Sequence, residues 1–169
     1  NTLVHGHNSV NMYRDEAQRV IDLCQRSDVP CLKGASRPME NINEVLPSEG
    51  LDFIVNLAKQ GVDFSILGTG PATDLAAFKL GYPDLAKKVP IIWAGSFPDE
   101  ETWKKYKYGE LNARADIASW RVLYQNHENL VVLPGWPGVV KVAVENSVFL
   151  PELRSKNKAI LNFLADILE

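Results

Sequence analysis

Several features that define common protein classes are missing from this sequence. Its 169 residues include only two cysteines, Cys24 and Cys31, which form neither a disulfide framework nor the spacing of a zinc site. No apolar run approaches the roughly 20 residues that a membrane-spanning helix needs, and no signal peptide is recognisable. We therefore expect a cytoplasmic protein without a membrane partner, in which both thiols are buried core groups.

A strongly basic character is missing too. The formal net charge is −3, whereas nucleic-acid-binding domains usually carry a basic face. Lys104, Lys105 and Lys107 form a dense basic run, interleaved with Tyr106 and Tyr108. Tyrosines in such a run can stack on bases, but the overall charge favours a solvated loop. We expect no nucleic-acid partner.

The sequence does not begin with methionine. It starts at Asn1, and residues 2–5 (TLVH) already have the composition of a strand. A domain rarely opens in the middle of its sheet, so we expect further residues to precede Asn1.

Short apolar runs alternate with longer runs of helical periodicity along the whole chain. This alternation predicts an α/β domain with a largely parallel sheet flanked by helices, and we expect a single domain over residues 1–169. The expected strands are 2–5, 29–32, 63–67, 89–94, 130–133 and 139–144. The expected helices are 11–26, 48–60, 73–80, one starting at Asp116 and one following Pro151.

Capping residues and apolar periodicity define the predicted helices. Ser48 and Asp116 are expected N-caps, and Gly61 is expected to end the helix that follows Ser48. The residues expected to be buried recur at helical spacing: Tyr13, Ala17, Val20, Ile21 and Cys24; Leu51, Ile54, Val55 and Ala58; Ile117, Trp120 and Tyr124; Leu153, Ile160, Leu161, Leu164 and Ile167.

In open parallel sheets, ligands bind outside the carboxyl ends of the strands. The turn GTGPATDLA (68–76) lies there, between a strand and a helix. Its glycines could expose N–H groups to a phosphate, which would suit a nucleotide-binding regulator. However, Thr73 replaces the third glycine of G-x-G-x-x-G, and no P-loop lysine follows. A tight turn before a capped helix is the simpler interpretation.

Other polar residues follow the expected strands. Glu110 and Asn112 would point the same way in an extended segment, and a carboxylate beside an amide suits a polyol, although a solvated loop end is the alternative. His5 and His7 alternate after the first strand, which is weak evidence for a metal. Trp93 ends a strand and is either core or an apolar wall for a sugar or base.

Several segments together resemble a known family, the nucleoside hydrolases (nucleoside N-ribohydrolases). TLVHGHNS resembles the family's second strand and V-x-G-N loop, and VPCLKGASRPM its V-P-V-x-x-G-A-x-x-P-L segment. LGTGPATDLA is similar to L-G-P-L-T-N-L-A, VPIIWAGSF to I-V-x-M-G-G, and GELNARADIASWRVLY to E-F-N-x-x-x-D-P-x-A-A. The segments occur in the family's order and with similar spacing, and the match extends as far as about Lys141. The resemblance implies a Rossmann-like nucleoside hydrolase fold, present here in part.

The resemblance also implies a function, the hydrolysis of the N-glycosidic bond of a nucleoside or related riboside by calcium-activated water. The carbonyl of Thr73 would be a calcium ligand, one of the six to eight oxygens that this ion takes. Glu110 and Asn112 would hold ribose hydroxyls, Trp93 would pack near the sugar, and His7 or Asn8 would replace the asparagine of V-x-G-N.

Some family features are not found. The D-x-D-x-x-D-D motif, which carries the general base and calcium ligands, would precede Asn1, and a further aspartate ligand would follow Glu169. Lys104 and Asp74 occupy positions where asparagine is expected. We therefore expect this chain to be inactive by itself, and the alternative is a catalytically dead binding module. An unpaired strand at a sheet edge favours association, so we expect a homo-oligomer.

Overall fold

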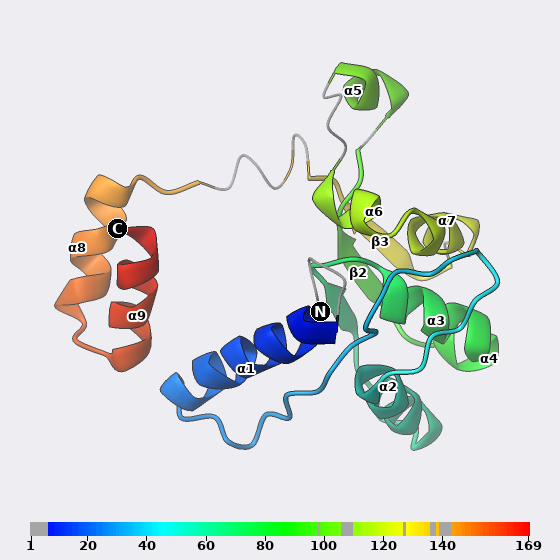
Figure 1. Ribbon diagram of the computed structural model, residues 1–169, viewed down its shortest axis with the longest axis horizontal. Coiled ribbons are helices and arrows are strands. Elements are labelled where there is room, and N and C mark those ends of the chain that lie inside the picture. Colours follow the sequence, from blue (N-terminus) through cyan, green and yellow to red (C-terminus); the bar gives the residue numbers. More distant parts are fainter. Residues whose placement is uncertain (1–6, 98, 106–109, 127, 136–137, 139–142) are drawn as a thin grey trace.

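The computed structural model of the chain describes residues 7–97, 99–105, 110–126, 128–135, 138 and 143–169 (Figure 1). Its centre is a parallel sheet of three strands in the order β1–β2–β3. These are β1 (Ile66–Gly68), β2 (Ile91–Ala94) and β3 (Leu130–Leu133). Ile91 of β2 is in register with Ile66 on one side and Leu130 on the other. The predicted α/β fold with a parallel sheet flanked by helices is confirmed.

Helices α3 (Thr73–Gly81) and α7 (Ile117–Gln125) pack against one face of the sheet. Their apolar side chains meet those of Ile91 and Trp93 in a buried cluster that includes Leu75 and Leu123. Almost every residue of α3 is buried, because α2 (Glu49–Lys59) and the short helix α4 (Pro83–Ala86) cover its outer side. A helix enclosed in this way is apolar around most of its circumference.

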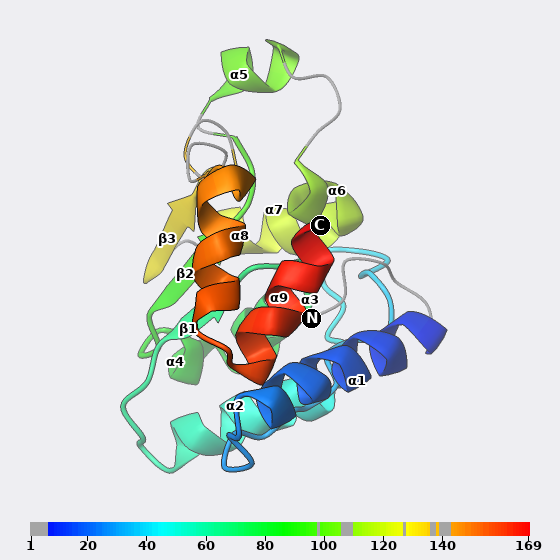
Figure 2. The same cartoon turned by 90° about the vertical axis from the view of Figure 1, so that its left-hand side faces the viewer.

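The remaining helices lie at the periphery. Figure 1 shows α1 (His7–Leu23) and the pair α8 (Asn146–Ser155) and α9 (Ala159–Leu168) on the side of the sheet away from α3 and α7. The view along the other axis agrees, with α8 and α9 side by side in front of the sheet and α1 below them (Figure 2). Two short helices, α5 (Glu100–Lys105) and α6 (Leu111–Ala115), occupy the connection between β2 and α7.

The predicted caps are confirmed. The hydroxyl of Ser48 accepts a hydrogen bond from Leu51 N at 2.9 Å and begins α2. The carboxylate of Asp116 accepts one from Ser119 N at 2.9 Å and begins α7. Gly61 follows the end of α2 with φ +69°, a conformation that glycine adopts at little cost.

Other predictions are wrong. Residues 29–32 are not a strand, and neither are Ala143 and Val144. The polar segment before Asp116 contains α5 and α6, because the acidic first turn of α5 and the capping of α6 by Glu110 favour helix there. Helix α1 begins at His7, before the predicted start at residue 11. Two helices, α8 and α9, are found where one helix was expected after Pro151. The predicted strand 2–5 and residues 139–142 lie outside the described residues.

Burial also differs from the prediction at several positions. Cys24 is exposed and Cys31 is only partly buried. Ala17, Ile117, Tyr124, Leu164 and Ile167 are exposed as well. Apolar periodicity located α1, α2, α3 and α7, but it does not state which apolar face another element covers.

Candidate functional site

Asn112 joins two of the turns that follow the strands. Its side-chain amide donates to the carbonyl oxygen of Ala94, at the end of β2, at 2.8 Å, and to that of Thr69, in the turn after β1, at 3.1 Å. Both turns lie at the carboxyl edge of the sheet, where parallel sheets bind ligands.

Glu110 holds the start of α6 against the turn after β2. One carboxylate oxygen accepts from Asn112 N, and the other accepts from Ala113 N and Ser96 N, all at 2.9 Å. A Cβ at Gly135 would lie 2.9 Å from Glu110 Cγ, so the turn after β3 approaches this side chain as only glycine can. Glu110 and Asn112 are therefore brought together, and they connect the ends of all three strands.

Trp93 lies in the core beneath this edge. Its side chain is completely buried, and its indole N–H donates to the carbonyl of Gly70 at 2.9 Å. A Cβ at Gly95 would lie 2.6 Å from the indole ring. Trp93 supports the turn after β1 from inside the protein.

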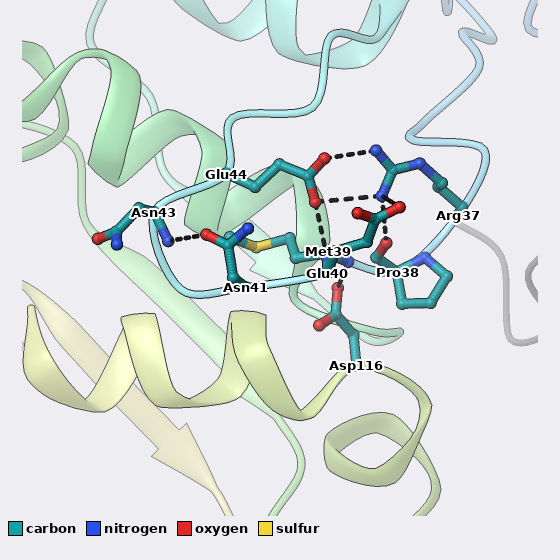
Figure 3. A network of polar contacts seen from close by, with 8 residues as sticks. All are labelled: Arg37, Pro38, Met39, Glu40, Asn41, Asn43, Glu44 and Asp116. Carbon is teal, nitrogen blue, oxygen red and sulfur yellow. Dashed lines mark hydrogen bonds and ion pairs between the residues drawn. The ribbon is translucent and has the colours of Figure 1, made fainter.

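Thr73 is the first residue of α3, and its hydroxyl donates to the carboxylate of Asp116 at 2.7 Å. The same carboxylate oxygen accepts from Met39 N at 3.0 Å (Figure 3). Asp116 and Thr73 are each only 2% exposed. The sequence predicted Asp116 as a helix cap, but it did not reveal the contacts with Thr73 and Met39.

Asp74 forms a second buried carboxylate site beside the first. Its two oxygens accept from Ala35 N at 3.1 and 3.2 Å, and one of them accepts from the hydroxyl of Ser48. The segment from Gly34 to Pro47, called here the 34–47 loop, is thus held by Asp74 of α3 at Ala35 and at Ser48, just beyond its end. Asp116, at the start of α7, holds it at Met39. Asp74 was missed as an anchoring residue, and its acidic character in the first helical turn was the available signal.

An ion pair lies on the outer side of the same loop. The Arg37 guanidinium donates to both oxygens of Glu44, and Glu44 also accepts from Glu40 N (Figure 3). Hydrogen bonding to Arg37 lowers the pKa of Glu44, and the same contact raises the pKa of Arg37.

A surface groove of about 610 Å³ runs between the 34–47 loop and the start of α7. It is lined in part by Met39, Asn41, Asp116, Ile117 and Arg121. The Asp116 carboxylate in this groove already accepts hydrogen bonds from Met39 N of the loop and from Ser119 N of its own helix. Its contacts therefore serve to hold the loop against α7.

The carbonyl of Thr73, predicted as a calcium ligand, has no free carboxylate beside it among the described residues. Calcium takes six to eight oxygen ligands, several of them carboxylates. The acidic side chains next to Thr73, those of Asp74 and Asp116, are engaged by N–H and hydroxyl donors. Among the described residues, no group of three or more His, Cys, Asp or Glu side chains is arranged to hold a metal ion. The described residues near Thr73 therefore supply no set of carboxylate ligands for calcium, and the role of the Thr73 carbonyl stays a prediction.

The remaining predicted site residues lie on another element. His7 and Asn8 are in the first turn of α1, not in a loop. His5 lies outside the described residues. Thr73, Glu110, Asn112 and Trp93 thus form one neighbourhood around the carboxyl edge of the sheet.

Parallel strands flanked by helices, with glycine turns and polar side chains at their carboxyl ends, place this chain in the class of α/β proteins. The chain belongs to the inosine-uridine preferring nucleoside hydrolase family, whose sequence model matches residues 2–169. The family predicted from the sequence is therefore confirmed. A comparison with curated proteins found no match. In the part of the chain that the structure describes, no helix combines the length and apolarity required to cross a membrane.

Proposed function

We propose that this chain belongs to an enzyme that hydrolyses the N-glycosidic bond of a nucleoside or a related riboside. The family match over residues 2–169 carries this proposal, and the cluster of Glu110 and Asn112 at the carboxyl edge of the sheet supports it. Glycosidic bonds of this kind break through a transition state with oxocarbenium character, which carboxylates and precise hydroxyl contacts stabilise.

In this proposal Glu110 and Asn112 accept hydrogen bonds from ribose hydroxyls. Both N–H groups of the Asn112 amide are engaged by carbonyls, which leaves its oxygen as the acceptor. The Glu110 oxygen that accepts only from Asn112 N also retains acceptor capacity, since a carboxylate has about four lone-pair sites and three of them are occupied. Trp93 shapes the site through Gly70, and His7 or Asn8 contributes from α1.

Calcium as the activator of the attacking water, with the Thr73 carbonyl as one of its ligands, is proposed only on the resemblance to the family. The described residues around Thr73 do not supply the carboxylate ligands that the ion needs. We propose that the chain by itself has no hydrolytic activity.

The binding module is the alternative. Glu110 and Asn112 make most of their contacts within the protein, a role that would be retained in a protein without catalysis. Such a module would bind a nucleoside at the same edge without cleaving it.

The test is an assay of the purified chain with a nucleoside panel and a chromogenic riboside, with added calcium and with EDTA. We expect no turnover, together with weak nucleoside binding that calorimetry detects and that Asn112→Leu removes. Leu111→Ala, at the exposed neighbouring position, is the control. Turnover abolished by EDTA would support the reaction but overturn the proposed inactivity. If the chain showed no binding and no turnover, this result would count against a nucleoside site in it.

Two further expectations remain proposals. Cys24 and Cys31 are free thiols, in keeping with a reducing compartment, and we propose that the protein is cytoplasmic. We also propose that it is a homo-oligomer.

A further inference from the structure

A cavity of about 330 Å³ lies between α7 and the segment that leads from β2 into α5. Its volume falls within the roughly 300–1,000 Å³ of small-molecule pockets. The ribose contacts proposed above use Glu110 and Asn112, neither of which lines this cavity. The residues that line it are Ser96, Phe97, Asp99, Glu100, Trp120 and Tyr124.

Aromatic side chains form the walls of the cavity. Trp120 and Tyr124 are one helical turn apart on α7, and their rings meet edge to face with centroids 5.6 Å apart. Phe97 adds a third ring from the turn after β2. Tyr124 is still 43% exposed, so this wall is open to an incoming molecule. Aromatic faces attract cations through the ring quadrupole.

The indole of Trp120 is not held by a hydrogen bond among the described residues. Its N–H group is buried and none of the described groups accepts from it, which is unusual for a buried donor. Turning the ring toward the cavity would therefore break no described hydrogen bond. A ligand that carries an acceptor would satisfy this donor.

Two carboxylates also line the cavity. Asp99 accepts from Thr102 N at 2.7 Å, and this hydrogen bond lowers the pKa of Asp99, so the group is ionised at neutral pH. Glu100 pairs with Lys104, but both side chains are largely exposed, and such pairs contribute little. No lysine or arginine is among the described lining residues. The charge of the lining is therefore negative.

Ser96 gives the cavity a fixed floor. Its φ of +65° is uncommon for a residue with a side chain, and it is only 3% exposed. Ser96 N donates to Glu110 at 2.9 Å, and its carbonyl accepts from Gly135 N at 3.1 Å. Contacts on both sides maintain the strained conformation, so this part of the cavity is ordered before a ligand arrives.

We propose that this cavity binds a small organic ammonium ion. The charge of the ligand lies beside Asp99 and Glu100, and its apolar body contacts the rings of Phe97, Trp120 and Tyr124. Negative charge selects cations over anions, and the aromatic walls select an ammonium ion with an apolar body over a hydrated metal ion. This site does not depend on the proposed hydrolysis.

The first experiment compares phenethylamine with two molecules of similar shape and different charge, phenylethanol and phenylacetate. Calorimetry on the unaltered chain measures the affinities, and proton–nitrogen correlation NMR follows the indole signal of Trp120, which Trp120→Phe assigns. We expect saturable binding of the amine that shifts this signal, affinity for the alcohol about fivefold weaker, and no binding of phenylacetate. Absence of amine binding, equal affinity for any two of the three molecules, or a shift confined to other tryptophans would overturn the proposal.

The second experiment removes the charges. Asp99→Asn combined with Glu100→Gln keeps the size of both side chains and is expected to weaken amine binding about fivefold, to the level of the alcohol. Glu101→Gln is the matched control, because this exposed neighbour does not line the cavity. Tyr124→Ala should weaken the binding of amine and alcohol alike, and circular dichroism checks that each variant folds. An unchanged preference for the amine in the double variant, or an equal loss in Glu101→Gln, would overturn the proposal.

Discussion

The 34–47 loop is held in two different ways on its two sides. On the inner side, Asp74 and Asp116 accept hydrogen bonds from main-chain N–H groups and hydroxyls in a buried environment. On the outer side, Glu44 pairs with Arg37 in contact with solvent (Figure 3).

The two sides differ in what removal of the acid leaves behind. Without an inner carboxylate, buried donors lose their acceptors, and each unsatisfied group costs about 1–3 kcal/mol. Without Glu44, Arg37 is still hydrated, and solvent-exposed ion pairs contribute little. We conclude that the inner carboxylates fix the position of the loop, whereas the outer ion pair contributes little to its stability.

Replacing Asp116 by alanine is expected to have the largest effect. Met39 N, Ser119 N and the Thr73 hydroxyl would lose their acceptor. Together with the lost helix cap, this predicts a loss of about 3–5 kcal/mol in the free energy of unfolding. Urea unfolding followed by circular dichroism measures it. Asp116→Asn keeps one acceptor oxygen and should lose less, so equal losses in the two variants would contradict the explanation.

Replacing Ser48 tests the second carboxylate site. Ser48 caps α2 and donates to Asp74, and Ser48→Ala is expected to lower the free energy of unfolding by about 1–2 kcal/mol. Ser48→Thr should retain most of the stability. Ser48→Asp is ordinarily an equivalent cap, but here its carboxylate would face Asp74. If Ser48→Asp proved as stable as the unaltered protein, the contact with Asp74 would have no energetic role.

Chemistry that acts over a few residues was predictable from the sequence. Ser48 and Asp116 were expected as caps because each bonds an N–H three residues ahead. The contact between Asp74 and Ala35 was not predictable, since the two residues are 39 positions apart. Glu110 and Asn112 were grouped correctly, but an extended segment was expected, and Glu110 instead caps α6. The strand predicted at residues 29–32 failed because no neighbouring strand pairs with it among the described residues.

Lys79 is a buried cation that can be compared with the buried carboxylates Asp74 and Asp116. Its ammonium group donates to the carbonyls of Asn126 and Glu128 just beyond α7, and burial lowers its pKa from the ordinary value of 10.5. Lys79→Met is expected to cost about 1 kcal/mol at pH 7, because the side chain is only partly desolvated and the carbonyls can be rehydrated.

The pH dependence of Lys79 provides a second measurement. The lowered pKa means that the unfolded chain binds this proton more tightly than the folded protein. The contribution of Lys79 to stability should therefore rise with pH between its lowered folded pKa and 10.5. Parallel urea titrations of both proteins up to pH 10 measure the difference. A difference that shrinks as pH rises would contradict the assigned desolvation.

The outer ion pair should give the smallest effect. Arg37 lowers the folded-state pKa of Glu44, so the contribution of Glu44 is complete above its unfolded pKa of about 4.3 and disappears as pH falls through the folded value. Comparing Glu44→Gln with the unaltered protein at pH 7 and pH 3 should show a small difference at pH 7 that is reduced at pH 3 and by salt. Glu152→Gln on α8 is the control. A difference as large at pH 3 as at pH 7, and unaffected by salt, would show that the pair does not act through charge.

The two carbonyls held by Asn112 also determine how the edge of the sheet can move. Because one amide binds both Thr69 and Ala94, the turns after β1 and β2 cannot separate without breaking a hydrogen bond. They move as one unit, and Glu110 couples the turn after β3 to them. A ligand arriving at this edge meets a surface that folding has already ordered, so little further entropy is lost when it binds.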